Sequence, residues 1–283
     1  MKSLKKAARQ NVGPEILNRI QQIIKTGLIE LKDDFKIYWR KFPIAKLSPG
    51  KNYLNPDINL IIDDMIESTD QTKLSNYILN WINKKIHEDL KSLIDLKNID
   101  LSNPTIRALS YQLYENNGVI KREKIIDYLN KLGQEERKIL RKIGVKFGRY
   151  HIFLFKLFKP GSVLLRIALW KNFHQKYFSL KPPKFGLNFL ESTSSNNQNF
   201  MLICGFEKFG NYYVRIDILE RLFVMIMNSK NKNEIMLTPE MLNLLGCSKE
   251  NFLKLIGKMN YKSFNKNKDI YFKYIVQKQS KKI

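Results

Sequence analysis

Residues 238–262 read TPEMLNLLGCSKENFLKLIGKMNYK, and this stretch indicates a fold more directly than any other part of the chain. Pro239 in a first turn predicts the start of a helix, and Gly246 predicts the turn that ends it. Ser248 then predicts the cap of a second helix. Two helices joined in this way form a helix-turn-helix element, in which the second helix has the recognition position. Such pairs also occur in ordinary protein cores, so the sequence leaves both uses open.

Two basic residues of this second helix, Lys254 and Lys258, are candidate contacts to nucleic acid. The segment that follows reads KSFNKNKDIYFKYI over residues 262–275 and carries further lysines. Its basic residues are consistent with a wing beside the helical pair.

A second basic region lies between Lys121 and Pro160. Basic residues spaced three or four apart predict one helix face that presents them together. Gly144 and Gly148 bracket a basic loop whose backbone can approach a phosphodiester, because neither glycine has a side chain. Aromatic residues among the charges are typical of platforms on which bases stack, although they also fit a role as core residues. The candidate nucleic-acid-binding residues here are Arg137, Lys138, Arg141, Lys142, Lys146, Phe147, Arg149 and Tyr150.

Most other segments predict helices. Apolar residues recur with the helical period from Lys73 to about Leu96. Phe35–Trp39 and Lys41–Leu47 predict a β-hairpin, residues 199–206 predict a strand, and we find no internal repeat. The sequence therefore predicts a predominantly α-helical α+β fold. We expect an N-terminal helix and hairpin over 1–70, a central basic helical domain over 71–185, and a C-terminal α+β domain with the helix-turn-helix-like element over 186–283.

The composition points to a polyanionic partner. The formal net charge is +24, and hydrophobic residues make up 43% of the chain, which is enough to build folded cores. A compact chain with such an excess repels itself, and binding to a polyanion relieves the repulsion. Nucleic acid is the commonest such partner.

The sequence offers little for catalysis. The only Gly-Lys pairs, Gly50-Lys51 and Gly257-Lys258, lie outside the GxxxxGK(S/T) pattern of a P-loop. Two cysteines and three scattered histidines predict a reducing compartment and no zinc site. Charges interrupt the most apolar stretch, residues 150–170, so it predicts no membrane span. We therefore expect a cytoplasmic protein with no catalytic residue, metal or cofactor, and no enzymatic activity on its own.

Several segments resemble a known family when they are taken in order. They are ARQNVGPEI (8–16), FKIYWRKFPIAKL (35–47), NPTIRALSYQLYENNGVI (103–120), GQEERKILRKIGVKFGRYHIFLFKLFKP (133–160), YYVRIDILERL (212–222) and MLTPEMLNLLGCSKENFLKLIGKMNYK (236–262). They resemble the C-terminal region of alphaproteobacterial DExH-box helicases akin to the RNA helicase of the mitochondrial degradosome. GVKFGRYHIF and LTPEMLNLLGCS are its most specific parts. The family's two motor lobes precede this region, and no residues of this chain match them.

The resemblance implies an accessory region or subunit of an ATP-dependent helicase. Such a module guides RNA or single-stranded DNA through phosphate contacts and stacking, and a separate motor subunit is its implied protein partner. Two alternatives stay open: a stand-alone helix-turn-helix regulator that binds duplex DNA, and a structural scaffold protein. A preference for single strands favours the helicase-accessory function, and sequence-specific binding to a duplex favours the stand-alone regulator.

Overall fold

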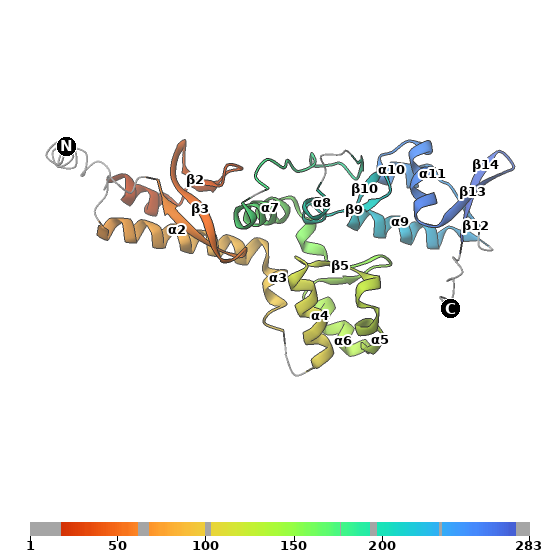
Figure 1. The fold of residues 1–283 in the computed structure, drawn as a ribbon, viewed down its shortest axis with the longest axis horizontal. Helices are drawn as coiled ribbons and strands as arrows, with labels where there is room; N and C mark the ends of the chain where they lie inside the picture. Colours follow the sequence, from red (N-terminus) through yellow and green to blue (C-terminus); the bar gives the residue numbers. More distant parts are fainter. Residues whose placement is uncertain are drawn as a thin grey trace. The chain divides into compact units, whose positions relative to one another are not determined.

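The structure, a computed structural model, describes residues 18–61, 68–99, 103–175, 177–192, 197–231 and 234–275 (Figure 1). The chain forms two compact units: Met1–Lys91 with Leu164–Ser179, and Ser92–Val163 with Leu180–Ile283. Each unit joins two separate segments, whereas the predicted three-part division runs along the chain. That division stays a prediction.

In the first unit, residues 18–26 are helical and a four-stranded antiparallel sheet follows. Its strands are β1 (Ile29–Leu31), β2 (Lys36–Trp39), β3 (Phe42–Asn52) and β4 (Asn55–Leu60), paired in that order. Strands β2 and β3 confirm the predicted hairpin. Helix α2 (Ser68–Asp89) packs against β4 and buries its apolar face, with Leu74, Ile78 and Ile82 fully covered. Helix α7 (Pro160–His174) contributes its later turns to this unit.

The second unit contains α3 (Lys91–Asp95) and then a group of elements that we call module A. Module A comprises α4 (Pro104–Glu115), β5 (Val119–Lys121), the 3-10 turn η2 (Arg122–Ile125), α5 (Ile126–Lys131), α6 (Gln134–Lys142), β6 (Val145–Phe147) and β7 (His151–Leu154). Asn103 caps α4 by accepting hydrogen bonds from the N–H groups of Thr105 and Ile106. The three strands pair in the order β5-β7-β6.

Module B ends the second unit and comprises α9 (Ile216–Asn228), β11 (Lys230–Asn231), β12 (Glu234–Met236), α10 (Pro239–Leu245), α11 (Lys249–Lys258), β13 (Tyr261–Lys266) and β14 (Asp269–Tyr274). Helices α10 and α11 lie where the helix-turn-helix was predicted. Gly246 ends α10 with a φ of 67°, and the Ser248 hydroxyl caps α11 by accepting from the N–H of Asn251. The strands pair in the order β11-β12-β14-β13.

The two modules repeat one arrangement. Each runs helix, strand, two helices and a two-stranded hairpin, with one additional strand, β11, before β12 in module B. The strand before the helical pair contacts the last strand in both modules: β5 pairs with β7, and β12 pairs with β14. This is the winged-helix form of a helix-turn-helix, in which the hairpin is the wing. The chain therefore contains a structural repeat that its sequence does not reveal.

A third set of elements joins the modules. After η3 (Phe155–Phe158) and α7 come β8 (Phe189–Glu191), α8 (Gln198–Ile203), β9 (Phe206–Phe209) and β10 (Tyr212–Arg215). The strands form an antiparallel sheet in the order β8-β10-β9. The strand predicted over residues 199–206 is wrong, because Asn197 accepts a hydrogen bond from the N–H of Phe200 and starts α8.

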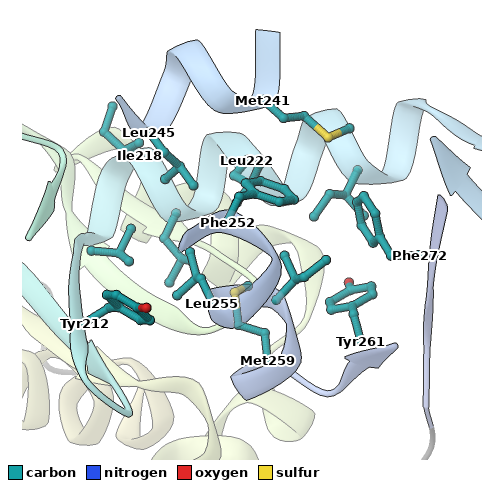
Figure 2. Packing of buried hydrophobic residues seen from close by; sticks show 14 of the residues in the cluster. Tyr212, Ile218, Leu222, Met241, Leu245, Phe252, Leu255, Met259, Tyr261 and Phe272 are labelled. Carbon is teal, nitrogen blue, oxygen red and sulfur yellow. The ribbon is translucent and has the colours of Figure 1, made fainter. Parts of the chain in front are cut away.

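The core of module B lies between its three helices and the inner face of its sheet (Figure 2). Phe252 of α11 has no exposed surface and meets Phe272 of β14 edge-on, with ring centroids 5.9 Å apart. Leu222 of α9 and Met241 of α10 complete the contact between the helices. This core orients α11 and the wing relative to each other.

The predicted fold class is wrong. Of the described residues, 51% are helical and 25% lie in strands, so the protein is mixed α/β with four small antiparallel sheets. Strands of three or four residues are too short to show an alternating pattern. Strand β7 shows none, because all four of its residues are buried. The predicted basic loop at 144–148 is largely strand β6.

We expect Phe252→Ala to lower the free energy of unfolding of the second unit by about 3–5 kcal/mol, since it leaves a cavity in the core. Urea unfolding followed by circular dichroism measures the change. Val224→Ala removes an exposed side chain from α9 and serves as the control, with an expected change within ~0.5 kcal/mol. Equal unfolding midpoints for the two variants would contradict this account of the core.

Candidate nucleic-acid interface

Helix α6 presents a basic surface at the recognition position of module A. Leu140 points into the core with no exposed surface, while Lys138, Arg141 and Lys142 are exposed. Lys138 pairs with Glu135 at 3.6 Å. In the described part of the chain, no carboxylate pairs with Arg141 or Lys142. These two cations remain available to an external anion.

Arg137 has a structural contact on the same helix. Its guanidinium donates hydrogen bonds to the carbonyl oxygens of Leu129 at 2.8 Å and Leu132 at 3.3 Å. Both carbonyls lie at the end of α5, and that of Leu129 also accepts a long hydrogen bond from the N–H of Leu132. Arg137 therefore fastens α6 to α5.

Phe147 lies on β6 beneath the basic side chains of α6. The guanidinium carbons of Arg137 and Arg141 each lie 5.6 Å from its ring centroid. These cation–π contacts bring the wing strand and the recognition helix together. A base can stack on this ring only where the guanidinium groups leave it uncovered.

The turn between β6 and β7 holds an internal anion. The Glu220 carboxylate of α9 accepts hydrogen bonds from the N–H groups of Arg149, Tyr150 and His151, the last two at 2.9 and 3.0 Å. A methyl group on Gly148 would lie 2.3–2.6 Å from this carboxylate, so any larger residue there would displace Glu220 from these donors. Glu220 occupies the position that the sequence suggested for a phosphodiester.

Tyr150 is also part of the packing between the modules. Its ring meets Phe209 and Phe223 edge-on, with centroids 6.3 and 6.0 Å apart. Burial raises the pKa of its phenol, and Tyr261 and Glu220 nearby act in the same direction. These contacts fit the core role that the sequence left open for Tyr150.

An open groove of about 800 Å³ lies between this wing and α9. Its cations include Arg122, Lys146, Arg149 and Arg221, and its rings include Phe155 and Phe223. The groove joins the basic surface of the wing to an apolar floor. Arg221 was missed by the sequence analysis, because only the fold brings α9 next to the wing. Arg122 and Phe155 lie in the predicted basic region but were not among its candidate residues.

Strands β5, β7 and β9 carry a charged cluster of Lys121, His151 and Glu207, in which His151 and Glu207 are buried. His151 Nε2 lies 2.9 Å from one Glu207 oxygen, and Lys121 Nζ lies 3.0 Å from the other. His151 and Glu207 are 1% and 3% exposed. Burial alone would lower the pKa of His151, but the hydrogen bond to Glu207 and the negative charge of Glu220, 3.8 Å from Nδ1, raise it overall. Burial alone would raise the pKa of Glu207, but the same His151 bond and Lys121 lower it.

Helix α11 of module B is engaged by the protein itself. Lys254 forms an ion pair with Glu250, and the aliphatic part of Lys258 packs over Gly210. Asn251 accepts a hydrogen bond from the Tyr212 hydroxyl and donates one to Glu191. One flank of α11 thus contacts strands β8 and β10. The predicted residues Lys254 and Lys258 lie on α11, a different element from the α6 and β6 surface of module A.

Among residues 18–61, 68–99, 103–175, 177–192, 197–231 and 234–275, no group of three His, Cys, Asp or Glu could hold a metal ion. Burial raises the pKa of Cys247 to about 11, so its thiol is not activated at neutral pH. No described helix is long and apolar enough to cross a membrane.

Comparison of the chain with protein-family models, with curated proteins and with solved structures found no match. The resemblance to the helicase region therefore stays a prediction.

The His151–Glu207 pair gives a prediction for stability. The raised pKa of His151 contributes stability that is complete below about pH 6.5 and is lost as the pH rises through its folded-state pKa. The lowered pKa of Glu207 contributes stability that is complete above about pH 4.5 and is lost as the pH falls through its folded-state pKa. We expect His151→Gln to remove most of the decline on the alkaline side.

Urea unfolding at about pH 6 and pH 8.5 measures this decline. His87→Gln, on the exposed face of α2, is the matched control and should keep the pH dependence of the parent. If the free energy of unfolding of His151→Gln falls between these pH values as steeply as that of the parent, the His151–Glu207 pair does not cause the loss of stability at alkaline pH.

Proposed function

We propose that this protein binds duplex DNA through module A, with α6 in the major groove and the β6–β7 wing against the backbone. One observation carries the proposal: Arg141, Lys142, Lys146 and Arg149 are exposed on the helix and wing of one winged-helix module, and no carboxylate in the described residues neutralises them. Phosphate contacts of this kind position a helix-turn-helix on a duplex.

The shape of the module favours DNA over duplex RNA. The major groove of B-DNA is about 12 Å wide and admits an α-helix. The major groove of A-form RNA is deep and narrow, and side chains cannot read it. A short, exposed recognition helix beside a wing therefore fits DNA better.

Fewer side chains of α6 are candidates for sequence-specific contacts to bases than for contacts to phosphates. Of the exposed residues of α6, Gln134 is the neutral side chain that can form two hydrogen bonds to adenine, and Arg141 can do so with guanine. With a net charge of +24, electrostatic attraction should dominate the affinity, so binding at low salt should tolerate many sequences.

The proposed DNA binding needs no catalysis by this chain. We place this function in the cytoplasm, because Cys204 and Cys247 are free thiols, as is usual in a reducing compartment. The helicase-accessory function implied by the resemblance stays a prediction. Single-strand binding coupled to a separate motor would support it over the proposal made here.

We expect charge reversal at both Arg141 and Arg149 to lower the affinity for a 20-base-pair duplex by at least about tenfold, which corresponds to about 1.4 kcal/mol. Loss of two phosphate contacts should also reduce the slope of log affinity against log salt by about 2. Fluorescence anisotropy with a labelled duplex at several salt concentrations measures both quantities. Circular dichroism melting checks that the fold is kept.

Charge reversal at Lys254 and Lys258 is the matched control, because it makes the same change in net charge on the second helix-turn-helix. We expect its effect on affinity to be much smaller. If both double variants lose the same amount of affinity, the duplex is attracted by the overall positive charge of the protein and does not bind at a site on α6. A larger loss in the control would move the interface to α11.

A further inference from the structure

The outer face of the sheet in module B carries side chains that the core does not use. Along β13 and β14 the inner positions, including Phe272, pack toward the helices (Figure 2). Because successive residues of a strand point to opposite faces, the intervening positions point outward. Three cross-strand pairs share this outer face: Lys262 with Lys273, Phe264 with Tyr271, and Lys266 with Asp269.

The middle pair forms an aromatic platform. The rings of Phe264 and Tyr271 stack with centroids 6.0 Å apart and an interplanar angle of 23°. Met236 of β12 pairs in register with Tyr271 and is 41% exposed. A row of three apolar side chains thus crosses three strands on the face opposite the helices. Exposed apolar rows of this kind lower the solubility of a protein unless they serve in binding.

Lysines surround the platform. Lys262 and Lys273 lie directly opposite each other, although like charges at such positions destabilise a sheet. In the described part of the chain no carboxylate pairs with either, while Lys266 pairs with Glu234 at 2.9 Å. The amino groups of Lys266 and Lys273 lie 5.6 and 5.9 Å from the ring centroids of Tyr271 and Phe264. The unneutralised Lys262–Lys273 pair is a place for an external anion.

We propose that the outer face of β12, β14 and β13 binds single-stranded nucleic acid, with bases on Phe264 and Tyr271 and phosphates at Lys262 and Lys273. Unpaired bases stack on aromatic side chains, and lysines along the platform hold the strand's phosphates. Sheet-borne aromatics bind RNA in this way elsewhere. A duplex does not offer its base faces, so this face selects single strands. The site lies on other elements than the α6 surface and does not depend on the duplex proposal.

The test uses the full chain, labelled single strands of twelve deoxythymidines or twelve uridines, and a 20-base-pair duplex. We expect Phe264→Ala with Tyr271→Ala to weaken binding of one or both single strands at least tenfold and to change duplex binding less than twofold. Tyr111→Ala with Phe42→Ala removes two exposed aromatics from other elements and should leave both affinities unchanged.

A second variant guards against a folding defect of the first. Lys262→Gln with Lys273→Gln keeps the aromatic rings and removes a repulsive pair, so its melting temperature should not fall. Its salt slope for the single strand should decrease by about 0.7 per lysine removed. Ultraviolet crosslinking of the parent to a bromouracil strand should place the adduct on β13 or β14.

Three results would overturn the proposal. The first is unchanged single-strand binding in both variants, or no such binding by the parent. The second is an equal loss for single strand and duplex, which would indicate general attraction. The third is a different ligand. If the parent binds vesicles with 30% phosphatidylserine, and both variants lose this binding but keep their affinity for nucleic acid, the face is a membrane contact.

Discussion

The carboxylate of Glu220 holds the two winged-helix modules together. It comes from the first helix of module B and accepts hydrogen bonds from three successive N–H groups in the wing of module A. A buried carboxylate is costly without partners, and three N–H donors supply what water would otherwise provide. The arrangement needs a residue without a side chain at Gly148 and an aromatic seal at Tyr150. The groove beside the wing exists because this contact places α9 next to β6 and β7.

This use of carboxylates also shapes the basic surface. The chain has 26 acidic residues against 50 basic ones, and two of the acids in the second unit, Glu207 and Glu220, are directed inward to buried donors. Glu207 pairs with His151 and Lys121, and Glu220 accepts hydrogen bonds from N–H groups of the wing, so neither carboxylate pairs with Lys146 or the Arg149 guanidinium. Arg149 shows the division within one residue, since its backbone N–H binds Glu220 while its guanidinium lies over Phe223 at the groove. Internal ion pairing therefore stabilises the wing without reducing its attraction for phosphate.

The sequence predicted what local signals determine. Gly246 and Ser248 act through their own neighbours, so the end of α10 and the start of α11 were predictable. Short, buried strands such as β7 were not, because their residues satisfy no pattern and form a sheet only after residues thirty positions apart are paired. The repeat escaped detection for a related reason: the two modules share an order of elements and a buried core, which different apolar residues fill equally well. Of the candidate site, charge spacing predicted the basic face of α6, whereas residues 144–148 were predicted as a loop and not as a wing. Glu220 and Arg221 needed the tertiary contact.

The two modules show how one scaffold can present different surfaces. A winged helix requires its core positions, such as Leu140 or Phe252, but it leaves the exposed faces of the recognition helix and the wing free to vary. In module A the exposed helix face is cationic and the wing is tied down by Glu220. In module B the helix face is occupied by the Glu250–Lys254 pair and by Asn251 contacts, whereas the sheet face carries lysines and a stacked aromatic pair. One flank of α11 is thus engaged by β8 and β10, so the surfaces left to a ligand differ between the modules: the helix and its wing in module A, and the outer sheet face in module B.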